Sequence, residues 1–187
     1  MKIRTIFIII SGFCAQHLIA QIEFTDNFRH LVENAGIDFY EPTEGSYKEV
    51  KLQKHSFQPC DFGIRSRREK LEIRYLIAPY SEYNIAFKAP HVECFRMVSN
   101  LATNEEDAAI TSLSISEDEL KENFNADWGK IYFFQPKDSF SERAHCKMLA
   151  LYSEGKGMAL VFFLFDEPSR DLDNRYLALR FKDEANN

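Results

Sequence analysis

The stretches CKMLALY at residues 146–152 and MALVFFLF at residues 158–165 decide the fold of this 187-residue chain. Both runs are short and mainly apolar, and Glu154-Gly155-Lys156-Gly157 lies between them. Because glycine adopts the backbone angles that tight hairpin loops require, this pattern predicts two antiparallel strands joined by a β-hairpin. The second run is apolar at every position, which is typical of a strand buried on both faces. We therefore expect residues 158–165 to form a buried strand.

A second hairpin is predicted upstream, where residues 61–66 lead into a charged tip at 67–70 and residues 71–78 return. The returning strand alternates, with Leu71, Ile73, Tyr75 and Ile77 on one face. Glu72 and Arg74 occupy the opposite face, which we therefore expect to meet solvent. Further strands are predicted at residues 110–115 and 128–134 and within 47–52.

Helices are predicted between these strands, at residues 22–35, 90–101, 117–125 and 169–181. In the second, Val92, Phe95, Val98 and Leu101 are spaced to face a core. The third begins with a capping box of Ser116 and Glu119. In the last, we expect Leu172, Tyr176 and Leu179 to point inward.

This order of elements predicts an α+β domain, a mostly antiparallel sheet with helices packed on it. We find no repeat and no linker that would divide residues 21–187, so they are expected to form one domain. The composition supports a substantial core, since 45% of the chain is hydrophobic and 14% is aromatic.

The first twenty residues have the composition of a secretory signal peptide. Lys2 and Arg4 precede an apolar run over residues 5–15, which is too short to span a membrane. Cleavage is expected after Ala20 in preference to Ala15. Phe13 stands before Cys14, where a lipoprotein needs a small residue, so a lipid anchor is not expected. The prediction is export to the periplasm or the extracellular space, with no further membrane-spanning stretch.

Charge and cysteine content limit the function classes. The formal net charge of −6 disfavours binding to nucleic acids through their phosphates. Cys60, Cys94 and Cys146 follow the predicted cleavage site, and this odd number leaves at least one free thiol. One disulfide and three reduced cysteines remain equal alternatives.

The chain carries few recognisable motifs of catalysis. It has no Gly-x-Ser-x-Gly pattern for a serine hydrolase, and Gly155-Lys156-Gly157 lacks the remainder of a phosphate loop. His91 and Cys94 share a helical face, but two ligands do not make a metal site. A hydrolase would have to combine a cysteine with His55, His91 or His145, or use a carboxylate pair that nothing selects. No cofactor is expected.

The hairpin tip is the candidate binding site. Arg65, Arg67, Arg68 and Lys70 place four cations within six residues of an acidic protein, where they could meet an acidic partner or anionic lipid head groups. The alternative is a solvated tip that discourages edge-to-edge strand pairing. The apolar residues Trp128, Tyr132 and Phe134 are interpreted as core.

Several segments carry a family resemblance: NADWG at residues 125–129, YFFQP at 132–136, KMLALY at 147–152 with GKG at 155–157, and FFLFD at 162–166. With KLEIRY at 70–75, they look like uncharacterised exported proteins of Bacteroidota. The arrangement over residues 45–181 resembles the PsbP-like α/β/α sandwich. This resemblance implies binding of partners in preference to catalysis, and it transfers no functional residues.

We therefore expect a non-enzymatic exported domain that binds a protein or an envelope component through a sheet face or the hairpin tip. The first alternative is a hydrolase with a Cys/His or carboxylate pair. The second is a carrier of an apolar small molecule, held in a phenylalanine-lined pocket between the sheet and a helix.

Overall fold

A computed structural model of the chain describes residues 22–42, 44–52, 60–168, 172 and 175–183, without the side chains of residues 85 and 86. The predicted signal peptide therefore lies outside the described residues. In chain order the elements are α1 (Asp26–Asn34), β1 (Ile37–Phe39), β2 (Lys48–Glu49), β3 (Phe62–Ser66), β4 (Leu71–Pro79), η1 (Ile85–Lys88), α2 (Pro90–Leu101), β5 (Thr111–Ser114), α3 (Glu117–Glu119), η2 (Leu120–Phe124), β6 (Trp128–Phe134), β7 (His145–Ser153), β8 (Gly157–Phe165) and β9 (Leu179–Phe181).

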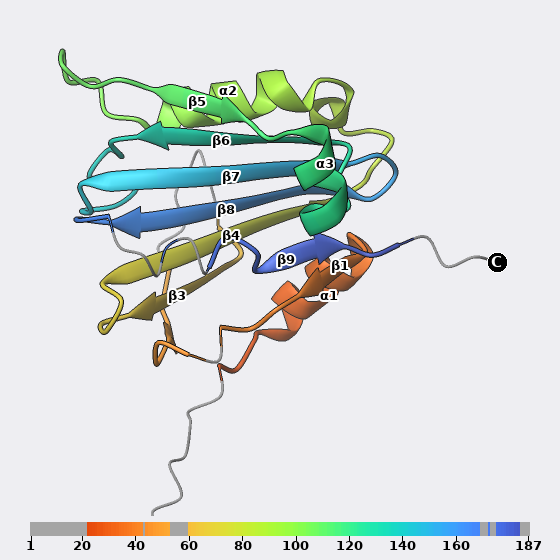
Figure 1. The fold of residues 1–187 in the computed structure, drawn as a ribbon, viewed down its shortest axis with the longest axis horizontal. Helices are drawn as coiled ribbons and strands as arrows, with labels where there is room; N and C mark the ends of the chain where they lie inside the picture. The colour runs from red at the N-terminus through yellow and green to blue at the C-terminus, as the bar shows by residue number, and fades with distance from the viewer. Residues whose placement is uncertain (1–21, 43, 53–59, 169–171, 173–174, 184–187) are drawn as a thin grey trace, which may run out of the picture.

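Seven of these strands form one antiparallel sheet in the order β2-β3-β4-β8-β7-β6-β5 (Figure 1). The predicted hairpin of β7 and β8 lies at its centre, with His145 opposite Phe165 and Ser153 opposite Gly157. All nine residues of β8 are buried, as the sequence predicts for this run. The predicted fold class, a mostly antiparallel sheet with helices packed on it, is confirmed.

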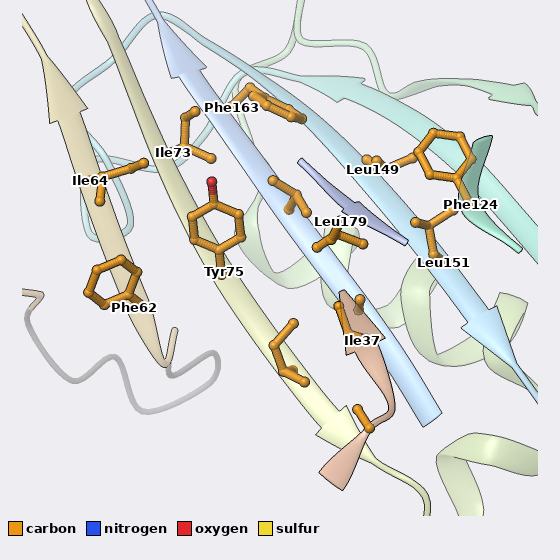
Figure 2. Close-up of a cluster of buried hydrophobic side chains, with 14 of the residues drawn as sticks. Ile37, Phe62, Ile64, Ile73, Tyr75, Phe124, Leu149, Leu151, Phe163 and Leu179 are labelled. Carbon is orange, nitrogen blue, oxygen red and sulfur yellow. The ribbon is translucent and has the colours of Figure 1, made fainter. Parts of the chain in front are cut away.

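Both faces of the sheet are covered, which explains why β8 is apolar at every position. One face packs against α1, η2 and a separate two-stranded ribbon of β1 and β9. Figure 2 shows Ile37 and Leu179 of this ribbon next to each other, in the cluster that also contains Tyr75. The opposite face packs against α2 through Cys94, Met97, Val98 and Leu101.

The buried face of α2 differs in part from the prediction. Val98 and Leu101 are buried as expected, but Val92 and Phe95 are more than half exposed. The observed face combines Cys94 with Met97, Val98 and Leu101, which are three, four and seven residues further along. This i, i+3, i+4, i+7 pattern is the face of an ideal helix, whereas a strict spacing of three drifts around it.

The predicted closing helix is wrong at its C-terminal end. Residues 179–181 form β9, which pairs antiparallel with β1, and residues 175–177 form a turn. Residues 169–171 and 173–174, where the predicted helix begins, lie outside the described residues. Leu172 and Leu179 are buried and Tyr176 packs against the core, so the predicted inward positions are confirmed.

The expectation that Glu72 faces solvent is also wrong. Its side chain is only 1% exposed and lies between the guanidinium groups of Arg65 and Arg74. The other boundaries agree closely with prediction, although α1 begins at Asp26, where the Thr25 hydroxyl accepts a hydrogen bond from the Phe28 amide. No helix in the described part of the chain is long and apolar enough to cross a membrane.

Candidate functional site

The predicted basic hairpin tip connects β3 to β4 near one edge of the sheet (Figure 1). Arg67, Arg68 and Lys70 are exposed there. Arg65, on β3, lies opposite Lys48 of the edge strand β2. The pairing of β2 with β3 therefore adds cations from a second strand to those of the tip.

These cations line a surface depression of about 620 Å³, here called the basic hollow. Among the described residues, its lining contains five cationic residues and one acidic residue, Glu49. The cationic residues are Lys48, Lys51, Arg65, Arg67 and Arg68. Such a concentration of positive charge on a chain of net charge −6 creates a local field that attracts anions.

A second depression of about 540 Å³, here called the polar hollow, lies beside the first. Val50, Lys51 and Arg65 line both, so the two hollows adjoin, and together they are here called the groove. The polar hollow is further lined by Leu52, Cys60, Glu72, Arg74, residues 138–143 and Asp166.

A buried carboxylate between two guanidinium groups joins the hollows. Arg65 Nε donates to Glu72 Oε2 at 2.6 Å, and Arg74 Nε donates to Glu72 Oε1 at 2.7 Å. The buried charge of Glu72 requires such partners, since an isolated carboxylate is costly to desolvate. Because two cations meet one anion, the cluster keeps one positive charge next to the groove.

Arg74 also fixes the opposite wall of the polar hollow. Its Nη1 donates to the carbonyl oxygen of Phe140 at 2.6 Å, and its guanidinium lies 4.9 Å from the centre of the Phe140 ring. Further along this wall, Arg143 donates to Asp166 at 2.5 Å. That hydrogen bond is the main reason why the pKa of Asp166 lies below its usual value.

The hairpin tip is anchored from beneath by Glu69, whose side chain is 5% exposed. Tyr47 Oη donates to Glu69 Oε2 at 2.5 Å, and Arg175 donates to both carboxylate oxygens at 3.0 and 2.6 Å. Burial by itself raises the pKa of Glu69, but the hydrogen bonds from Arg175 and Tyr47 outweigh it and hold the pKa below its usual value. We call Tyr47, Glu69 and Arg175 the Glu69 cluster.

The structure thus brings three of the four predicted site residues together. Arg65, Arg67 and Arg68 line the basic hollow, whereas Lys70 is exposed and lines neither hollow. Sequence reasoning missed Lys48 and Lys51. The predicted strand within 47–52 contained both, but its pairing with β3 could not be read from the sequence.

The described cysteines are all free thiols, which resolves the question that the sequence left open. Burial raises the pKa of Cys60 and of Cys94 to about 12, and it also raises that of Cys146. A thiol that holds its proton is a poor nucleophile. His145 is exposed while Cys146 beside it is buried, as expected for neighbours on opposite faces of a strand.

Of the other two candidate histidines, only His91 is among the described residues, and it forms no pair with Cys94. His91 is exposed and Cys94 is buried, although they share a helix. His55 lies outside the described residues. Within the described ranges, no group of three His, Cys, Asp or Glu residues could hold a metal ion.

Four of the phenylalanines pack against one another in the core and do not line a pocket for an apolar ligand. Phe24, Phe28, Phe39 and Phe62 form a cluster with Tyr75, with ring centres 4.8–6.4 Å apart. They fill the core beneath α1 and line neither hollow of the groove.

No protein-family model matches the sequence, and no curated protein matches it significantly.

Proposed function

We propose that this protein is a non-enzymatic exported domain that binds an anionic protein or envelope component in the groove beside the β3–β4 hairpin. The observation that carries this proposal is the charge of the basic hollow, where five cationic residues face one acidic residue on an otherwise acidic chain. The predicted signal peptide at residues 1–20 supports export.

The way in which the tip is held supports a binding role. A tip that only deters edge pairing needs charge but no fixed geometry. Here the Glu69 cluster ties the tip to Arg175, which is 106 residues away along the chain. Fixing cationic side chains before a ligand arrives lowers the entropic cost of binding.

Salt-dependent retention on immobilised heparin, used as a generic polyanion, tests the proposal. We expect the wild-type domain to be retained and Arg67→Glu with Arg68→Glu to flow through, because the substitutions cancel the net positive charge of the basic hollow. A matched control is Arg29→Glu with Lys88→Glu, which changes two exposed cations outside the groove by the same net charge. The control should be retained like the wild type.

A pull-down from an envelope extract, analysed by mass spectrometry, then addresses the partner. The wild-type domain and the control pair should recover the same anionic components, and the tip variant should lose them. Equal recovery by all three proteins, or equal elution from heparin, would overturn the proposal.

A further inference from the structure

The polar hollow differs from the basic hollow in its charge balance, and this difference limits the chemical classes of ligand that could fill both hollows. Among the described residues, its lining contains four cationic and four acidic residues. These are Lys51, Arg65, Arg74 and Arg143, with Glu72, Asp138, Glu142 and Asp166. A charge-balanced wall gives no preference to an anion, so the part of a ligand that occupies it should be neutral.

The lining is nevertheless rich in hydrogen-bonding groups. Carboxylates accept hydrogen bonds, guanidinium and ammonium groups donate them, and the hydroxyl of the exposed Ser139 does both, whereas the buried Ser141 hydroxyl is used by the Arg143 amide. A ligand that matches this wall must itself both donate and accept at several points. Hydroxyl groups have this property, and a sugar ring carries several of them in a rigid arrangement.

The hollow offers little to an apolar or flat aromatic ligand. In the described part of the chain, its apolar lining residues are Val50, Leu52, Cys60 and Phe140. Phe140 is buried, with Arg74 over its ring and Phe162 in an edge-on contact at 5.4 Å between ring centres. The volume of about 540 Å³ lies within the range of small-molecule sites.

The wall that carries the serines is held in place before a ligand binds. The amides of Phe140 and Ser141 donate to the Lys137 carbonyl at 2.8 and 2.9 Å, and the Arg143 amide donates to the Ser141 hydroxyl at 3.2 Å. Arg74 ties the same segment to β4. The polar hollow is therefore formed by hydrogen-bonded backbone as well as by surface side chains.

We infer that the groove binds an acidic oligosaccharide, with an anionic group in the basic hollow and sugar hydroxyls in the polar hollow. Lys51 and Arg65 line both hollows and would contact the ligand where the two parts meet. This inference rests on the proposed function and specifies its partner. The acidic group is a carboxylate, a sulfate or a phosphate, since all three suit Lys and Arg.

The contributions of the two hollows to binding can be measured with two probes that carry the same number of carboxylates, of which only one carries hydroxyl groups. Isothermal titration compares tetragalacturonate with a short polyacrylate of equal carboxylate number. We expect the wild-type domain to bind tetragalacturonate at least about tenfold more tightly, the effect of one or two additional hydrogen bonds. A sulfated tetrasaccharide and a phosphorylated one, compared in the same way, identify the preferred acidic group.

Ser139→Trp fills the polar hollow without changing the charge of the protein. It should abolish the preference for tetragalacturonate and leave polyacrylate binding unchanged. Ser81→Trp, at an exposed serine that lines neither hollow, is the matched control and should keep the preference. Thermal unfolding of both variants verifies that they fold.

The outcomes for the two proposals are distinct. Equal affinity of the wild type for both probes, or a preference that survives Ser139→Trp, overturns the oligosaccharide inference and leaves the anion-binding function in place. Failure of both probes to bind, or polyacrylate binding that survives Arg67→Glu with Arg68→Glu, overturns the proposed function itself.

Discussion

The two predicted hairpins of this protein close their turns in different ways. Between β7 and β8, the turn uses glycines at positive φ, with Gly155 at 71° and Gly157 at 127°. Between β3 and β4, the turn contains no glycine, and Lys70 takes a positive φ of 51°. A side chain in that region costs about 1–2 kcal/mol, so the second turn needs support from elsewhere.

That support is the Glu69 cluster, in which a residue of the turn is bound by Tyr47 and Arg175 from distant parts of the chain. The turn of the central hairpin needs no such support from distant residues. Every residue of β8 is buried, and the neighbouring strands β4 and β7 hold β8 in position. The comparison shows that the β3–β4 turn has a residue in an unfavourable backbone conformation, and that contacts with distant residues hold its charged side chains at a fixed place. This is the behaviour expected of a functional turn.

The largest effect is expected in the central turn. Gly157→Ala should destabilise the protein by about 4 kcal/mol, because Gly157 has a φ that side chains rarely adopt and a Cβ would meet the Ala78 carbonyl. Gly155→Ala has open space around it and should cost only about 1 kcal/mol. Urea unfolding measures both values, and equal costs would show that close packing at Gly157 does not matter.

A smaller loss is expected when the β3–β4 tip loses its anchor. Arg175→Met should reduce the free energy of unfolding by about 3 kcal/mol at pH 7, because it leaves the buried Glu69 carboxylate without its cation. Since Arg175 lies in neither hollow, the loss would report on anchoring of the tip. Denaturant unfolding between pH 3 and 7 measures it.

The pH dependence of this loss identifies its cause. In the wild type the folded pKa of Glu69 is lowered, so its contribution to stability is present above the unfolded pKa of about 4.3 and disappears as pH falls through the folded value. The deficit of Arg175→Met should therefore shrink as the solution is acidified. Arg29→Met, at an exposed position of α1, serves as control, and a deficit independent of pH would contradict the ionic explanation.

The smallest effect is a gain in stability. Lys70→Gly should stabilise the protein by about 0.5–1 kcal/mol, because glycine relieves the positive φ but loses more conformational entropy on folding. Thermal unfolding measures this gain. Retention on heparin should change little, since Lys70 lines neither hollow, and a large drop in retention would place Lys70 in the binding surface.

The sequence predicted the strands well where a single local signal dominates. Residues 158–165 and 128–134 are short apolar runs next to turn residues, as is typical of buried strands, and the capping Ser116 accepts a hydrogen bond from the Glu119 amide as expected. The prediction failed at residues 179–181. There β9 pairs with β1, a three-residue strand that the sequence analysis did not predict. The signal peptide and the resemblance to exported proteins remain predictions.

The candidate site shows the same division. The sequence by itself determined the cations Arg65, Arg67, Arg68 and Lys70, because charge clustering within one turn is visible in a linear chain. Only the tertiary structure decided that Lys48 and Lys51 join them, that Glu72 is buried between two arginines, and that Glu69 turns inward to Arg175. The physical reason is range: turn and strand signals act over a few residues, whereas strand pairing and ion pairing join residues that the sequence keeps far apart.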